Sequence, residues 1–236
     1  MINEKGVVIN MILFEGMRWV HIVAGFLALF TFWIPIVTKK GGKVHTRIGW
    51  IYTSAMAIVS VSAWYMGLYR IFFSPYSDSE VISFAWFLIY IGLLSAATAW
   101  YGIRVLRFKH RKSRHRHSID LLFPFLLLSG GIGMSIYGHF INFPLLAWFP
   151  LVGIFLGGSQ LWYWLRVPKM KGQWLIEHIV GMLSCSIATI TAFTVFGAPQ
   201  LLNIAGSHPV LWFIPTIVML PVIIGFTTYY TKKFSH

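Results

Sequence analysis

Long apolar runs alternate with short polar connections along this chain of 236 residues. Seven of the runs are long enough to cross a hydrocarbon core of about 30 Å, which takes roughly 20 helical residues. They cover residues 12–37, 48–73, 81–106, 118–142, 145–166, 174–198 and 209–231. The runs are continuously apolar and do not alternate in polarity, which favours helices over a membrane β-barrel. The sequence therefore predicts an all-α polytopic bundle of seven transmembrane helices.

The connections between these runs are too short for a separate soluble domain, so residues 1–236 are predicted to form one domain. The first run is interpreted as a retained span and not a signal peptide, because the residues around its start contain no small-residue cleavage site. Cys185 is the single cysteine and lies inside the sixth run. One chain can therefore form neither a disulfide nor a cysteine-based metal site.

Basic residues gather in four places that alternate with pairs of apolar runs. Sixteen of the nineteen Lys and Arg residues lie there, in Lys39–Arg47, Arg104–Arg116, Arg166–Lys171 and Lys232–Lys233. Cytoplasmic loops of membrane proteins carry such an excess of Lys and Arg. The distribution predicts that the N-terminus lies outside and the C-terminus in the cytoplasm.

The formal net charge of +13 would suggest a nucleic-acid partner for a soluble protein. Here the alternating basic loops account for the charge, so no nucleic-acid partner is expected. The longest of them, RVLRFKHRKSRHR from Arg104 to Arg116, is expected to rest on anionic lipid of the bilayer. A specific phosphate- or nucleic-acid-binding patch is the alternative, but the loop lacks the interleaved aromatic residues of such patches.

Histidines are the main candidates for chemistry, because only six acidic residues are present and no nucleotide-binding or hydrolase motif occurs. The predicted topology sorts them into two groups. His45, His117 and His178 fall near the cytoplasmic face, whereas His21, His139 and His208 fall near the outer one. Ionisable residues inside spans are costly and mark functional sites.

His21 ends a polar stripe on the first run. Glu15, Arg18 and His21 follow one another at intervals of three residues and so share a sector of a helix. One interpretation turns this stripe toward the bundle interior. In the other, Glu15 pairs with Arg18 at the headgroups and His21 bonds a backbone carbonyl.

Two other runs carry matching stripes, each with an imidazole followed at offsets of 4, 7 and 11 residues by small, soft or polar side chains. The stripes are His45, Gly49, Tyr52 and Met56 in one run, and His178, Met182, Cys185 and Thr189 in the other. Two or three converging imidazoles could ligate a metal or a haem iron. The alternative is that each histidine makes a local hydrogen bond at the interface.

The fourth run has a histidine at each end. His117 and His139 are 22 residues apart, which is close to six turns and about 33 Å along a helix. That distance places the pair at opposite membrane faces and not around one buried haem. Asp120 lies one turn from His117 and is expected to orient its imidazole.

Several stretches resemble a known family. They are H-I-V-A-G-F-L-A-L from His21, K-G-G-K-V-H-T-R-I-G-W-I-Y from Lys40 and E-H-I-V-G-M-L-S from Glu177. They are similar to a family of predicted bacterial multi-pass membrane proteins that is catalogued as a domain of unknown function. The resemblance implies a protein of the bacterial cytoplasmic membrane and brings no established activity. Histidines at several helix ends are also loosely similar to di-haem membrane cytochromes of the b561 kind.

Three function classes are compatible with these patterns. The first is a membrane redox protein that holds b-type haem and passes electrons toward quinone or a redox partner. Its inner ligands would be His45, His117 and His178, and its outer ones His21 and His139. The second is a zinc-dependent intramembrane enzyme, with the three inner histidines on the metal and Asp120 or Glu177 as acid/base. The third is a small-solute transporter or accessory subunit.

Overall fold

The computed structural model describes residues 4–74, 78–203 and 209–235. Regular structure in these ranges is helical, and seven helical segments there are long and apolar enough to span a membrane. They are Ile9–Val37, Lys43–Phe72, Ser79–Phe108, Ser118–Phe140, Pro144–Leu165, Gln173–Leu202 and Ile214–Ser235. The protein is thus an all-helical, multi-pass membrane protein, as the apolar pattern predicts. The largest shifts at the start of a span are in the second, which begins at Lys43 where residue 48 was expected, and in the seventh, which begins at Ile214 where residue 209 was expected.

Proline interrupts the first span. The helix α1 (Glu4–Thr31) ends just before Phe32, and the short helix α2 (Trp33–Val37) follows. Pro35 has no backbone N–H, and its ring clashes with the carbonyl four residues earlier, which is that of Thr31. The break therefore falls where the proline makes a continuous helix unfavourable.

Two later spans are interrupted in related ways. The fifth is made of α6 (Pro144–Trp148) and α7 (Pro150–Leu165), which both begin with the proline that suits a first helical turn. The sixth consists of α8 (Gln173–Ala192), the π-helical turn η2 (Phe193–Gly197) and α9 (Ala198–Leu202). Pro199 cannot donate to the carbonyl of Val195, which accounts for the altered hydrogen bonding of that turn.

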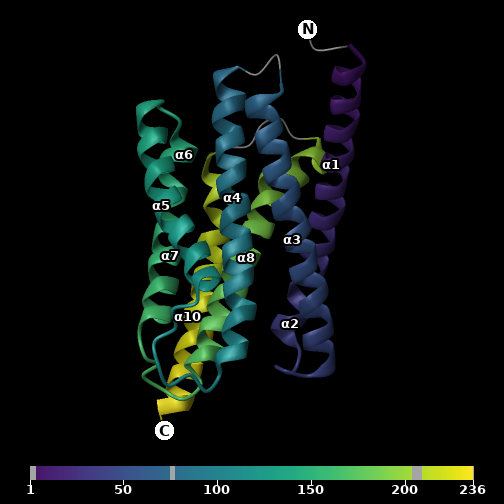
Figure 1. Cartoon of the computed structure of the whole chain (residues 1–236). Helices are drawn as coiled ribbons and strands as arrows, with labels where there is room; N and C mark the ends of the chain where they lie inside the picture. Colours follow the sequence, from purple (N-terminus) through teal and green to yellow (C-terminus); the bar gives the residue numbers. More distant parts are fainter. Residues whose placement is uncertain (1–3, 75–77, 204–208, 236) are drawn as a thin grey trace. The chain divides into compact units, whose positions relative to one another are not determined.

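Backbone contacts divide the chain into two compact units, which are described separately. Unit 1 ends at Gly92 and unit 2 begins at Leu93, both within α4 (Ser79–Arg104). In unit 1, α1 lies along α3 (Lys43–Phe72), and α2 packs against α3 as well (Figure 1). Trp64 of α3 donates from Nε1 to the carbonyl oxygen of Ile89, at 3.1 Å, and so joins α3 to the first half of α4.

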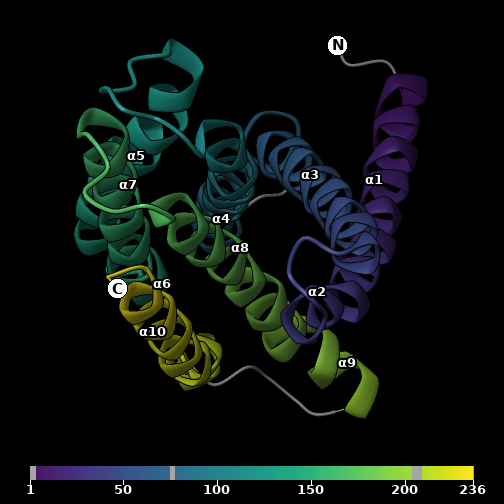
Figure 2. The same cartoon turned by 90° about the horizontal axis from the view of Figure 1, so that it is seen from below.

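Unit 2 contains the second half of α4 and the remaining helices. New elements are η1 (Val105–Phe108), α5 (Ser118–Phe140), η3 (Pro209–Trp212) and α10 (Ile214–Ser235). The helix α5 packs along α7, and α10 packs along α8 (Figures 1 and 2).

Two glycines bring α4 and α8 into close contact within unit 2. A Cβ atom added to Gly181 would lie 2.8 Å from the Cα of Gly102 and 3.1 Å from the carbonyl oxygen of Thr98. These are backbone atoms, which cannot turn aside as a flexible side chain can. Small residues allow membrane helices to approach this closely. The contact sets the first turns of α8 against the end of α4.

Candidate functional site

Asp120 is a fully buried carboxylate in the first turn of α5, and hydrogen-bond donors surround it. Nε of Arg104, at the end of α4, lies 2.7 Å from Oδ1 and 2.9 Å from Oδ2. One turn earlier, Trp100 donates from Nε1 to Oδ1 at 3.2 Å. His115, from the basic loop, brings Nε2 to 2.6 Å from Oδ2. The result is a charge-assisted network that joins α4, the loop and α5.

The imidazole held by Asp120 is not the one that the sequence spacing indicates. His117 was the expected partner, but its Nδ1 lies 3.8 Å from Oδ2 and its side chain is 51% exposed. His115 takes the closer place because its backbone N–H donates to the carbonyl of Trp164 at 2.9 Å, and its ring packs against Phe108 and Trp164. The loop therefore folds back on unit 2 and places His115 against the end of α7 and the start of α5.

Arg111 fastens the same loop to the end of α7. Its two Nη atoms donate to four carbonyl oxygens at 2.7–3.1 Å, those of Ser113, Tyr163, Trp164 and Arg166. The last carbonyls of a helix have no partner within the helix, so the guanidinium supplies their missing donors. The loop that was expected to rest on anionic lipid is thus also part of the packed structure.

Glu177 is the second acidic residue of the site and lies one turn into α8. Tyr101 of α4 donates its hydroxyl to Oε2 of Glu177 at 2.6 Å. The Tyr101 side chain is 2% exposed and meets Tyr163 and Trp164 edge-on, with ring centroids 5.9 and 5.7 Å apart. Arg111 also interacts electrostatically with Glu177. A carboxylate on a membrane-spanning helix thus has Tyr101 and Gln173 as hydrogen-bond partners and interacts with one cation.

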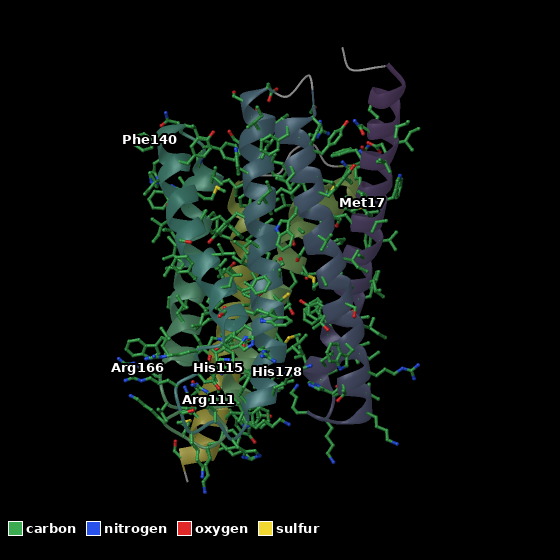
Figure 3. The ribbon with its side chains drawn as sticks, viewed as in Figure 1. Met17, Arg111, His115, Phe140, Arg166 and His178 are labelled. Atoms are coloured by element: carbon green, nitrogen blue, oxygen red, sulfur yellow. The ribbon has the colours of Figure 1, made fainter. Side chains whose placement is uncertain are left out.

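His178 follows Glu177 and donates from Nδ1 to the carbonyl oxygen of Gly102 at 2.6 Å. Side chains two positions apart on a helix point about 200° away from each other. Gly102 therefore lies on the side of α4 opposite to Trp100 and Arg104, so His178 and the Asp120 centre meet this helix on opposite sides. Figure 3 shows Arg111, His115, Arg166 and His178 at one end of unit 2, with Phe140 at the other.

In unit 1, Nδ1 of His21 lies 2.9 Å from Oγ of Ser62. The single hydrogen of that hydroxyl is directed to backbone carbonyls of its own helix, so the imidazole is the donor. Glu15 and Arg18 are half exposed and pair with each other at 2.7 Å. The pairing predicted as the alternative for Glu15 and Arg18 is therefore confirmed, and His21 bonds both Ser62 and the backbone of Val59.

His45 and His139 also donate from Nδ1 to backbone oxygens. His45 bonds the carbonyl oxygen of Pro35 at 3.1 Å. The same oxygen accepts a hydrogen bond from Nζ of Lys40 at 2.8 Å. Burial lowers the pKa of Lys40. His139 bonds the carbonyl of Ser135 at 2.8 Å. It lines an open hollow of about 540 Å³ together with Ser135, Ile136 and Phe140.

Within the described ranges, no three or more His, Cys, Asp or Glu side chains are grouped as metal ligands. The residues of the predicted zinc cluster are divided between the two units, with His45 in unit 1 and His117 and His178 in unit 2. His117 and His115 approach one carboxylate oxygen of Asp120 instead. The zinc hypothesis has no supporting arrangement in this part of the chain.

The predicted haem ligands do not form facing pairs inside either unit. In unit 1, His21 bonds Ser62, which lies 17 residues beyond His45 on α3 and so about 25 Å from it. In unit 2, His117 and His139 lie at opposite ends of α5, and His178 meets the opposite side of α4 from the Asp120 centre. Two imidazoles on one haem iron must face each other across the porphyrin, and the described histidines of a single unit do not.

Five residues of the site were not expected from the sequence: Trp100, Tyr101, Arg104, Arg111 and His115. The only local signal for them was the four-residue spacing of Trp100 and Arg104, which places both on one helix face. The predicted histidine His208 lies outside the described residues. No family model, curated protein or solved structure matches this chain.

Proposed function

We propose that this chain is a proton-coupled multi-pass protein of the bacterial cytoplasmic membrane, with Glu177 as its proton-binding residue. The observation that carries the proposal is the 2.6 Å hydrogen bond from the buried hydroxyl of Tyr101 to Glu177, inside a membrane-spanning helix. Ionisable residues in such helices are costly, and they mark proton relays and transport pathways. The resemblance to the bacterial membrane family supports the proposed location.

Glu177 suits proton exchange better than Asp120 does, because their partners differ. Asp120 bonds a guanidinium through both oxygens, so its protonation would break a buried ion pair. Glu177 bonds a phenol, which is a neutral donor, and Arg111 acts on it without a direct ion pair. Glu177 can therefore gain and lose a proton while its hydrogen-bonded neighbour stays in place.

Proton uptake by reconstituted vesicles tests this proposal. A potassium gradient with valinomycin sets the membrane potential, and a trapped pH-sensitive dye reports protons that enter. We expect the wild-type protein to admit protons and Glu177→Gln to reduce uptake to that of protein-free vesicles. Glu80→Gln is the matched control, because Glu80 is exposed in the first turn of α4, and its uptake should equal the wild type. Wild-type uptake no faster than in empty vesicles would refute the proposal.

A membrane redox protein with b-type haem is the second candidate. It is favoured by one shared feature of His21, His45, His139 and His178: each donates from Nδ1 to a protein oxygen. Such a bond sets the imidazole in the tautomer whose Nε2 carries the lone pair, as in metal-ligating histidines. Quinone or another redox partner would then exchange electrons, and Glu177 would take up the accompanying proton.

Absorption spectroscopy separates the two candidates. The protein is purified in detergent from haem-replete cells, and its spectrum is recorded before and after reduction. A haem protein shows a Soret band that moves on reduction and that His178→Ala weakens, whereas His110→Ala, in the exposed loop, leaves it intact. A spectrum without a Soret band removes the redox candidate and leaves proton coupling.

A further inference from the structure

The open hollow of about 540 Å³ beside His139 lies along the last two turns of α5, at the end of unit 2 away from the basic loop (Figure 3). His139 lies 21 residues beyond Ser118, where its span begins, and so about 31 Å along the helix. That length matches the thickness of a hydrocarbon core, about 30 Å. The hollow is therefore expected at the boundary between lipid tails and head groups, within reach of molecules dissolved in the bilayer.

Close packing of α5 against α6 fixes the polar wall of the hollow. A Cβ atom added to Gly138 would lie 2.8 Å from the Cα of Ala147, so the two backbones touch here. The hydroxyl of Ser135 donates to the carbonyl oxygen of Ala147 at 2.6 Å. The ring of Trp148, in α6, meets that of His139 edge-on, with 5.2 Å between the centroids. These contacts hold the imidazole in position beside the hollow.

The hydrogen bond of His139 determines which ring nitrogen a ligand meets. Nδ1 lies 2.8 Å from the carbonyl oxygen of Ser135, and because a carbonyl oxygen only accepts, Nδ1 carries the hydrogen. In the neutral imidazole Nε2 then has the lone pair and accepts. His139 is exposed, so a ligand can approach this atom. The imidazole thus offers a ligand one acceptor.

The lining restricts the class of ligand. Phosphate and carboxylate groups are bound by charged donors such as Arg and Lys, whereas Ile136 and Phe140 are the other side chains of the wall beside Ser135 and His139. A primary ammonium brings three donors to a single acceptor, and a quaternary ammonium has no hydrogen for Nε2. A neutral hydroxyl group brings one donor and matches the site. The aromatic rings of Phe140 and Trp148 favour a flat ring as its carrier.

We propose that the hollow beside His139 binds the ring of a lipid-soluble quinol, whose hydroxyl group donates a hydrogen bond to Nε2 of His139. The volume of the hollow lies within the range of small-molecule sites, about 300–1,000 Å³. An oxidised quinone carries carbonyl oxygens in place of the hydroxyls, and these accept but do not donate. The site therefore prefers the reduced form. It goes beyond the proposed role of Glu177 and does not depend on it.

Calorimetric titration of the full chain in phospholipid nanodiscs tests the site, with empty nanodiscs as the blank. The probe is a benzoquinol with a decyl tail, kept reduced under nitrogen. We expect the wild type to bind it several-fold more tightly than the matching quinone. His139→Ala should weaken quinol binding several-fold, up to about tenfold, because the hydroxyl loses its acceptor. Quinone binding as tight as quinol binding, or no wild-type binding above the blank, overturns the proposal.

A second pair of variants leaves the imidazole in place. Ile136→Trp fills the hollow from its apolar side and should abolish quinol binding, and Ile136 is 53% exposed, so the larger side chain need not be buried. Ile132→Trp is the matched control, one turn earlier on the same side of α5 and also exposed, and it should bind as the wild type does. Undiminished binding by Ile136→Trp contradicts the site. Displacement of the quinol by an equal amount of diacylglycerol assigns the hollow to a hydroxyl lipid and also overturns the proposal.

Discussion

Asp120 accepts hydrogen bonds from three side chains, whereas the shortest bond to Glu177 comes from a single neutral phenol. At the residue scale this difference separates structural from chemical roles. The oxygens of Asp120 are occupied by Arg104, Trp100 and His115, which come from two segments of unit 2. Asp120 therefore has mainly a structural role, as a junction that joins α4, the basic loop and α5. Its replacement should lower the free energy of unfolding.

Asp120→Asn keeps the shape of the side chain but removes the charge opposite Arg104, whose side chain is only 16% exposed. Breaking a buried ion pair on one side costs about 3–5 kcal/mol, because the other charge stays behind unpaired. Denaturation of the detergent-solubilised protein with SDS measures the change in unfolding free energy. Asp78→Asn is the control, because exposed Asp78 caps the N–H of Val81 and Asn caps equally well. Equal stability of the two variants would contradict the junction role.

At the element scale, the candidate site depends on how closely α4 and α8 approach. Gly102 and Gly181 allow this contact, and the contact brings Tyr101 to Glu177 and the carbonyl of Gly102 to His178. These two polar contacts depend on the close approach of the α4 and α8 backbones. With larger residues in place of Gly102 and Gly181 the helices would lie further apart, and Tyr101 and His178 could not reach their partners. Glycine is therefore required here for packing and not for an unusual φ.

Gly181→Ala is expected to destabilise unit 2 by about 1–3 kcal/mol, because the added methyl group meets backbone atoms of α4 and the helices must separate. Gly158→Ala on α7 is the control, because a Cβ there meets nothing within 4 Å. Alanine favours a helix over glycine by up to about 1 kcal/mol, so this control should be neutral or stabilised. The same SDS titration compares them, and a stabilised Gly181→Ala would show that the helices are less tightly packed.

At the scale of the whole molecule, seven apolar helical segments and four basic places determine the membrane topology that we propose. Many large apolar side chains are exposed along these segments, among them Ile12, Phe30, Phe125 and Ile217. Such residues are expected to face lipid. The excess of basic residues in the connections is expected to place those connections at the cytoplasmic face.

Cysteine labelling tests the orientation directly. In a Cys185→Ser background, which removes the single cysteine, we expect Ser79→Cys to react with a membrane-impermeant maleimide on intact spheroplasts. Lys112→Cys, in the basic loop, should react only after the membrane is opened. Ser79 and Lys112 are both exposed, so accessibility within the protein does not separate them. The opposite labelling pattern would reverse the proposed topology.

The sequence alone determined that the protein is helical and where its seven spans lie. These features are local, because each span must satisfy its own backbone in lipid. Only the tertiary structure decided that Asp120 holds His115 and that Tyr101 meets Glu177, 76 positions away. Helical periodicity shows which residues share a face, but it does not determine which helices pack together or how each is rotated.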